Sequence, residues 1–197
     1  MKPYFYTNRQ GKVHYFRAVK TKKGKYRYYV TSSKDFDNLI HEIPEGYEVA
    51  ELPEDAKVVI RKQKTIFIHE EEQNITSNGI EQLSDLKDFF LYPDSEYLYV
   101  YHSQFNYIAG QDENLSKQQA MEVWGKEITR WMRFFTAFRF QLVDEKQRLF
   151  QAQRVVFTGA YGHTFHPVGS KQTIDKLVLL YAPHLGRASF FNIEPNN

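Results

Sequence analysis

The sequence predicts an α+β fold, with an antiparallel β-rich module at the N-terminus and a larger antiparallel α+β module after it. In the N-terminal part, short alternating runs rich in Tyr, Phe and Val are separated by turns that contain glycine, a pattern typical of hairpin-linked strands. In the C-terminal part, some segments instead carry apolar residues three and four positions apart, which is the spacing of an amphipathic helix. Aromatic residues make up 16% of the chain, and each buried ring contributes a large area to a core.

The N-terminal module is predicted to span residues 1–62. Residues 3–31 are expected to form a three-stranded antiparallel meander, because three alternating segments are separated by two turns that each contain a glycine. A hairpin of residues 47–51 and 57–61 is expected next, since Pro and acidic turn-forming residues stand between those two strands. We expect a short helix over residues 34–42.

The C-terminal module, residues 65–197, is expected to combine strands and helices and to begin with an acidic segment. Its predicted strands cover residues 65–69, 97–101, 138–143, 148–157 and 188–193. Its predicted helices cover residues 80–91, a segment that begins at Ser116, and a segment that begins at Ser170 and ends before Pro183. Gln119 stands three residues after Ser116, as in a capping box. Residues 70–72, three consecutive glutamates, are interpreted as an exposed acidic turn.

Charge is distributed unevenly along the chain, although the net charge is only +2. Residues 1–34 contain ten Lys or Arg and no Asp or Glu, whereas residues 35–96 contain five basic and sixteen acidic side chains. These two segments therefore carry +10 and −11, and the remaining residues carry +3. Such asymmetry indicates either a polyanionic partner or neutralisation of one segment by the other.

The basic N-terminal segment interleaves its cations with aromatic residues. This combination suits single-stranded nucleic acid, because cations neutralise phosphates and rings stack on bases. In the expected third strand, Lys25, Arg27 and Tyr29 share one face, since alternate residues of a strand point to the same side. Together with Arg17 on the neighbouring strand, they are the candidate nucleic-acid-binding residues. Two other interpretations stay open: a small β-domain with a tyrosine core and lysine-protected edges, or a basic sheet docked on the acidic segment.

Residues 159–169 are interpreted as a loop that leads into the last helix, and they form part of a second candidate site. His163 and His166 stand three residues apart, and Ser170 and Lys171 stand at the predicted helix start, where free backbone N–H groups can hold an anion. These four residues form a candidate anion-binding site. Histidines at this spacing can also ligate a metal, but we expect no metal because no carboxylate stands at a supporting spacing. The alternative is a surface loop followed by a capped helix.

The composition disfavours several functional classes. The chain has no cysteine, which excludes disulfides, thiol catalysis and Cys-ligated zinc or iron–sulfur clusters. The sequence contains neither a nucleophile elbow nor a zincin motif, and we expect no cofactor. The N-terminus shows no apolar signal-peptide segment, and no apolar run approaches the ~20 residues that span a bilayer. We therefore expect a cytoplasmic protein without a membrane partner.

The favoured interpretation is a non-enzymatic binding or adaptor protein with nucleic acid as its partner. The first alternative is an enzyme, or a protein that binds a small ligand or anion, using the His163–Lys171 loop. The second alternative is a scaffold that binds other proteins. Salt-dependent binding of nucleic acid distinguishes the favoured interpretation from both alternatives.

Recognisable motifs stand at both ends of the chain. The N-terminal motifs are Tyr4-Phe5-Tyr6, Asn8, Gly11-Lys12, Ile43-Pro44-Glu45-Gly46-Tyr47-Glu48 and Ile60-Arg61-Lys62. The C-terminal motifs are Arg139-Phe140, Leu142-Val143, Arg148-Leu149-Phe150, Arg154, His184-Leu185-Gly186 and Ser189-Phe190-Phe191. These motifs resemble the two ends of a group of uncharacterised prokaryotic proteins. The resemblance implies a two-part organisation, and it assigns no activity and no functional residue.

Overall fold

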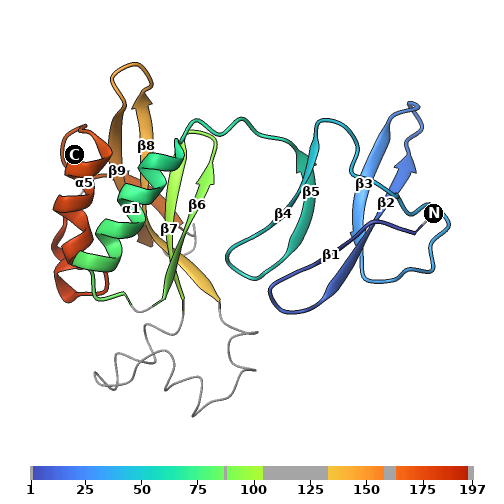
Figure 1. Ribbon diagram of the computed structural model, residues 1–197, viewed down its shortest axis with the longest axis horizontal. Helices are drawn as coiled ribbons and strands as arrows, with labels where there is room; N and C mark the ends of the chain where they lie inside the picture. Colours follow the sequence, from blue (N-terminus) through green and yellow to red (C-terminus); the bar gives the residue numbers. More distant parts are fainter. Residues whose placement is uncertain (1, 87, 104–132, 158–162, 195–197) are drawn as a thin grey trace, which may run out of the picture. The chain divides into compact units, whose positions relative to one another are not determined.

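The computed structural model describes residues 2–86, 88–103, 133–157 and 163–194. It is an α+β structure with antiparallel sheets, as the sequence predicts. The chain divides into two compact units (Figure 1): residues 2–63 belong to the first, and residues 64–86, 88–103, 134–157 and 163–194 belong to the second. Each unit has its own sheet structure and its own buried residues.

The first unit begins with a three-stranded antiparallel sheet, which confirms the predicted meander. Its strands are β1 (Phe5–Thr7), β2 (Val13–Lys20) and β3 (Tyr26–Thr31), in the order β1-β2-β3. Gly11 and Gly24 lie in the two turns with φ of 75° and 80°, a left-handed conformation that glycine adopts without a steric penalty. The turn residues that define the meander are therefore visible in the sequence.

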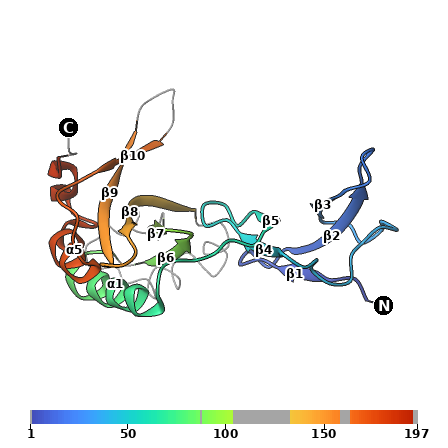
Figure 2. The ribbon, with the colours of Figure 1, turned by 90° about the horizontal axis from the view of Figure 1, so that it is seen from above.

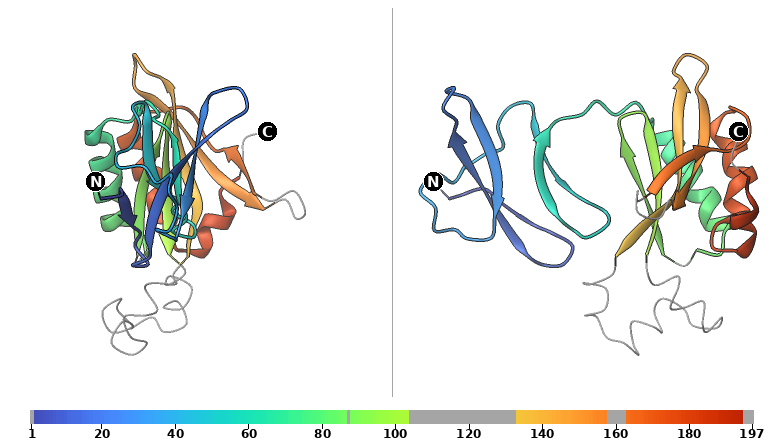
Figure 3. Two further views of the ribbon diagram at one scale, coloured as in Figure 1. Left: turned by 90° about the vertical axis from the view of Figure 1, so that its right-hand side faces the viewer. Right: turned by 180° about the vertical axis from the view of Figure 1, so that it is seen from behind.

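A two-stranded hairpin packs against this sheet, and its strands agree with the predicted ones. They are β4 (Tyr47–Glu51) and β5 (Val58–Lys62) (Figure 3). Phe16 of β2 is fully buried, and the Tyr28 ring of β3 meets Tyr47 edge-on, with ring centroids 4.8 Å apart. The strand register puts Phe16 and Tyr28 on the same face, which is therefore the inner face of the sheet.

The segment between the sheet and the hairpin is not helical, so the prediction of a helix over residues 34–42 is wrong. Its backbone instead follows β2. The Ala18 N–H donates to the Asn38 carbonyl at 3.0 Å, and the Ile40 N–H donates to the Phe16 carbonyl at 2.8 Å. An isolated helix of this length is marginal in water, whereas pairing with β2 satisfies the backbone groups directly.

The turn between β1 and β2 is tied to the hairpin by polar contacts. Asn8 is only 5% exposed; its Nδ2 donates to the Ala56 carbonyl at 2.9 Å, and its Oδ1 accepts from the Lys12 N–H at 2.9 Å. Arg9 forms an ion pair with Glu51 at 3.0 Å. These contacts give Asn8 and Arg9 a structural role inside the first unit.

The second unit is a five-stranded antiparallel sheet with helices packed on one face (Figures 1 and 2). Its strands are β6 (Phe89–Asp94), β7 (Tyr97–Ser103), β8 (Phe134–Asp144), β9 (Leu149–Phe157) and β10 (His163–Pro167), in the spatial order β10-β9-β8-β7-β6. Its helices are α1 (Glu70–Leu83), α5 (Ile174–Tyr181) and the short 3₁₀-helices η2 (Ala182–His184) and η3 (Ala188–Asn192). Among the described residues, no helix is both long and apolar enough to cross a membrane.

The predicted strands in the middle of this sheet are confirmed, whereas several flanking predictions are wrong. The segment predicted as a strand over residues 65–69 is irregular, and the one predicted as a strand over residues 188–193 forms the helix η3.

The helix predicted over residues 80–91 begins earlier, at Glu70, and ends at Leu83, and the strand β6 follows it. Leu86 continues the helical spacing and packs on the core from beyond the end of the helix, whereas Phe90 lies in β6 and stacks on Tyr101 on the opposite face of the sheet. The helix predicted from Ser116 lies outside the described residues.

One hydrophobic core joins the helices of the second unit to its sheet. Its most buried members are Leu98 and Val100 of β7, Phe138 and Phe140 of β8, Phe150 of β9, Ile80 of α1, and Leu177 and Val178 of α5. These strand residues all project toward the helices. The opposite face of the sheet is therefore free to carry polar and aromatic side chains.

Gly79 lets α1 and α5 approach closely, and we expect Gly79→Ala to destabilise the second unit. A methyl group at Gly79 would overlap Cγ1 of Val178, which is buried. At an ordinary helix position Gly→Ala stabilises by about 1 kcal/mol. Here overpacking should instead cost about 1–3 kcal/mol, measured by urea denaturation. Asn78→Ala, at an exposed position of the same helix, is the control. Unchanged or increased stability of Gly79→Ala would contradict this close packing.

Candidate functional site

The outward face of the three-stranded sheet, opposite Phe16, carries the predicted nucleic-acid-binding residues. Arg17 of β2 is the direct partner of Tyr29 of β3, and Arg27 stands two residues before Tyr29. Directly paired residues of an antiparallel sheet project from the same face, so Arg17, Arg27 and Tyr29 lie together on the outward face. Lys25 immediately precedes β3 and is exposed.

Arg17 is held between two aromatic rings. Its guanidinium carbon lies 5.5 Å from the centre of the Tyr29 ring and 4.6 Å from the centre of the Phe36 ring. Tyr29 and Phe36 are 41% and 40% exposed. Cation–π contacts orient a guanidinium without neutralising its charge. The site therefore presents a full positive charge beside two accessible rings, the combination that binds phosphates and stacks on bases.

A second cation–aromatic pair lies on the same face, at β1. The Lys2 amine is 5.2 Å from the centre of the Phe5 ring, which lies 6.5 Å from the ring of Tyr15, its partner on β2. Tyr15 stands two residues before Arg17, so this pair also belongs to the outward face. A pocket of about 380 Å³ adjoins the pair, and it is lined by Lys2, Pro3, Phe5, Val13, Tyr15 and Lys34.

The central cations of the outward face have no acidic partner in the described part of the chain. The ion pairs of the first unit join Arg9 and Arg61 to glutamates of β4, and neither involves Arg17, Lys25 or Arg27. Residues 1–63 contain thirteen basic and eight acidic side chains, a net charge of +5. The first unit is therefore cationic as a whole, and part of its positive charge lies on the outward face.

Three residues of this surface were missed by sequence reasoning: Lys2, Phe5 and Phe36. Lys2 and Phe5 belong to the basic aromatic segment, but only the strand register shows that Phe5 faces outward with Tyr15. Phe36 stands between two aspartates in a segment predicted to be helical. An aromatic residue isolated in a polar segment was the only local signal available for Phe36.

The second candidate site is not assembled as predicted. His163 and His166 lie on strand β10 rather than in a loop, and residues three apart in a strand project from opposite faces. The N-cap residue of α5 is Thr173, so the prediction that Ser170 caps this helix is wrong. The free N–H groups of the helix therefore begin beyond Ser170 and Lys171, both of which are exposed.

The face of the second sheet that lies opposite the helices carries a cluster centred on Arg139 of β8. Its guanidinium carbon lies 4.1 Å from the ring centre of Tyr97 and 3.9 Å from that of Phe165. Its Nε donates to Oε1 of Gln153 at 2.6 Å, and a terminal nitrogen donates to the Tyr99 hydroxyl at 3.0 Å. These contacts fix the position of the Arg139 guanidinium among the side chains of this face.

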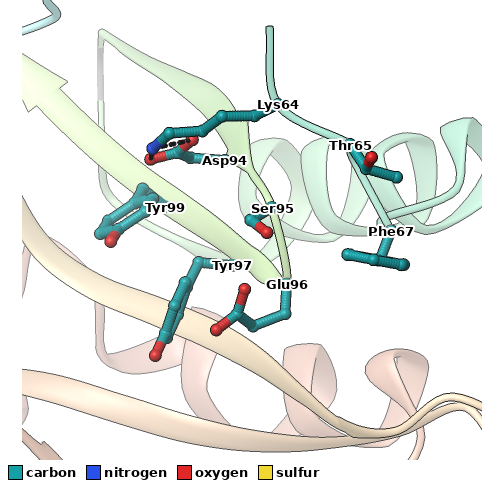
Figure 4. A pocket seen from close by; sticks show the side chains of 8 residues that line it. All are labelled: Lys64, Thr65, Phe67, Asp94, Ser95, Glu96, Tyr97 and Tyr99. Atoms are coloured by element: carbon teal, nitrogen blue, oxygen red, sulfur yellow. Dashed lines mark hydrogen bonds and ion pairs between the residues drawn. The ribbon is translucent and has the colours of Figure 1, made fainter. Parts of the chain in front are cut away.

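A pocket of about 520 Å³ opens at the turn between β6 and β7 (Figure 4). On one side, Nζ of Lys64 lies 2.8 Å from both carboxylate oxygens of Asp94. Tyr97 and Tyr99 point their hydroxyls to the same side, and Glu96 lies near Tyr97. Burial raises the pKa of Tyr97 above its usual value of 10.0, so this phenol is protonated at neutral pH. The pocket supplies mainly hydrogen-bonding groups.

Within the described residues, no three His, Cys, Asp or Glu side chains gather in a way that could hold a metal ion. Among the surfaces described above, the outward face of the first sheet combines the most features that a ligand requires: cations, exposed rings and fixed spacing.

Comparison with known proteins adds no family, since no protein-family model, no curated protein and no solved structure matches this chain.

Proposed function

We propose that this protein is a non-enzymatic binding protein of the cytoplasm that binds single-stranded DNA or RNA through the outward face of β1, β2 and β3. The observation that carries the proposal is the placement of Arg17 between the exposed rings of Tyr29 and Phe36. Rings stack on bases of any sequence and cations bind phosphates, so we expect little sequence preference. Single-stranded nucleic acid is favoured over a duplex because the faces of its bases are accessible.

The spacing of the sheet supports repeated contacts along one strand of nucleic acid. Alternate residues on one face of a β-strand are about 7 Å apart, and neighbouring strands are about 4.8 Å apart. The outward face has successive rows of cationic and aromatic side chains: Phe5 with Tyr15, then Arg17 with Tyr29, then Arg27. A nucleic-acid strand that follows β2 would meet a ring or a cation in each row.

Fluorescence anisotropy with a labelled single-stranded oligonucleotide tests the proposal at about 50 mM salt, where phosphate contacts are strong. We expect the intact protein to bind, and Tyr29→Ala to bind about 5- to 150-fold more weakly, which corresponds to ~1–3 kcal/mol for a lost stacking contact. Tyr26→Ala is the matched control. Tyr26 lies on the same strand and is 55% exposed, but it belongs to the opposite face, so its replacement should leave the affinity unchanged.

Two results would contradict the proposal. The absence of binding by the unaltered protein at low salt would exclude nucleic acid as the partner. Equal losses for Tyr26→Ala and Tyr29→Ala would show that the outward face is not the binding surface. A duplex of the same sequence should bind more weakly than the single strand, because its bases are already stacked on one another.

A further inference from the structure

The second unit contains a cavity of about 600 Å³ on the helix side of its sheet, near η3 (the sheet and helices are seen from behind in Figure 3). Its apolar wall includes Val100, Phe135, Val156, Leu185 and Phe190. Cavities of about 300–1,000 Å³ with mainly apolar walls and a few placed polar groups are typical sites for small molecules. The polar groups of this cavity therefore indicate which ligand it suits.

Arg154 of β9 is the principal polar group in the wall of this cavity. One terminal nitrogen donates to the backbone carbonyls of Phe190 at 3.3 Å and Phe191 at 3.2 Å. Its Nε is buried and has no acceptor among the residues that the structure describes. Carbonyl groups satisfy some donors of a guanidinium but supply no negative charge. A partly buried guanidinium without a counter-ion favours an anion that would pair with it.

Arg187 and Asp85, which also line the cavity, neutralise each other. Arg187 donates two hydrogen bonds of 2.8 Å to the carboxylate of Asp85. His102 also lines the cavity, and its burial lowers its pKa below the usual 6.5, so it adds hydrogen-bonding capacity without a charge at neutral pH. Arg154 is therefore an arginine of this lining that pairs with no carboxylate among the described residues.

We propose that this cavity binds a small molecule with an apolar body and one carboxylate group. The carboxylate pairs with Arg154, whose planar fork of donors matches carboxylate geometry, and the apolar body packs against Val100, Val156 and Phe190. This site lies in the second unit and shares no residue with the outward face of the first sheet. Ligand binding here and nucleic-acid binding there can therefore be tested separately.

Isothermal titration calorimetry with octanoate and octanol tests the proposal on the full chain. The two molecules have the same apolar body and differ in charge. Octanoate should bind one molecule per chain, and octanol should bind about 10- to 100-fold more weakly, because it cannot form a charge-assisted hydrogen bond with the guanidinium. Equal affinities, or no octanoate binding in the millimolar range, would overturn the proposal.

Variants of the chain test whether Arg154 is the residue that pairs with the carboxylate of the ligand. Arg154→Gln should weaken octanoate binding about 10- to 100-fold and leave octanol binding unchanged. The double variant Asp85→Asn with Arg187→Gln, which removes the neutral ion pair from the same lining, should leave octanoate binding nearly unchanged. Because Arg154 also supports the backbone of η3, Arg154→Lys is included. It retains the charge and should keep most of the preference for octanoate. An Arg154→Gln variant that retains the full preference would refute the assignment.

Discussion

Replacing Glu72 with alanine should lower the free energy of unfolding of the second unit by about 3 kcal/mol. Removing one member of a buried ion pair costs about 3–5 kcal/mol, because the other charge is left buried without a partner. The lower end of this range applies here. The Glu72 side chain is 9% exposed, but its partner Arg148 is 24% exposed, so water can partly solvate the guanidinium that remains.

Glu72 supports the start of α1 and the turn between β8 and β9 at once. Its Oε1 accepts from Nε of Arg148 at 2.8 Å, and its Oε2 accepts from the His69 N–H at 2.8 Å. The second bond satisfies a backbone donor at the helix N-terminus, where no carbonyl is available within the helix. Arg148 adopts a positive φ of 51° and also donates to the Phe67 carbonyl. Loss of Glu72 therefore weakens the helix cap and the turn together.

Urea denaturation followed by circular dichroism measures this effect. Glu71→Ala, at the adjacent and exposed position, is the control and should change the free energy of unfolding by less than about 0.5 kcal/mol. Glu72→Gln should give an intermediate value, because an amide oxygen can still accept from the His69 N–H but carries no charge for Arg148. If Glu72→Ala proves as stable as Glu71→Ala, the pair contributes nothing to the fold.

The role of Glu72 could not be predicted from the sequence. Three consecutive glutamates are typical of an exposed turn, and Glu70 and Glu71 are indeed exposed, but Glu72 is only 7% exposed. The interpretation of all three as an exposed turn was therefore wrong. Its partner stands 76 residues later in the chain. Only the packing of the β8–β9 turn beside α1 brings the two charges together, and no local pattern records that approach.

Strands that pair with the next strand along the chain were predictable, because the alternation of apolar and polar residues and the turn-forming residues between strands are local features of the sequence. The meander β1–β3 and the hairpins β4–β5 and β8–β9 all belong to this class. The end of α1 was not predictable. Apolar residues continue at helical spacing to Leu86 and Phe90, yet the helix ends at Leu83. Leu86, Phe89 and Leu91 pack on the helix-side core, whereas Phe90 stacks on Tyr101 on the opposite face of the sheet. Helical spacing in the sequence therefore identified neither the element that carries these residues nor which of them face the core.

The outward face of the first sheet and the cavity around Arg154 also differ in how far the sequence predicts them. The common face of Arg17, Arg27 and Tyr29 follows from the two-residue period of a strand. The contact of Phe36 with Arg17 depends on backbone pairing between Ala18 and Asn38, which the sequence does not show. The cavity around Arg154 is assembled from several separate segments of the second unit, so its lining is visible only in three dimensions.

Raising the salt concentration from about 50 mM to about 200 mM should weaken the binding of single-stranded nucleic acid by about 50-fold. Each phosphate contact with a single strand contributes about −0.7 to the slope of log affinity against log salt concentration, because counterions are released. Four exposed or aromatic-paired cations on or beside the outward face are the candidates for such contacts: Lys2, Arg17, Lys25 and Arg27. About four contacts give a slope of about −2.8.

Substitutions separate the contributions of charge and stacking to this slope. Arg27→Ala should weaken binding and make the slope less steep by about 0.7 to 1. Tyr29→Ala should weaken binding with little change in slope, because stacking releases no counterions. Lys20→Ala is the control for charge: Lys20 is an exposed cation of β2, but its strand partner is Tyr26, on the opposite face. Anisotropy titrations at several salt concentrations measure all three.

The salt dependence of unfolding without nucleic acid provides an independent check on the same surface. If acidic residues neutralise the basic sheet internally, added salt should screen those attractive pairs and lower the stability of the first unit. Binding would then be absent even at low salt. In our proposal the cations of the outward face repel one another within residues 1–63, whose net charge is +5, so added salt should screen the repulsion and raise stability slightly. The two interpretations therefore predict opposite signs for one measurement, which requires no assumption about the bound partner.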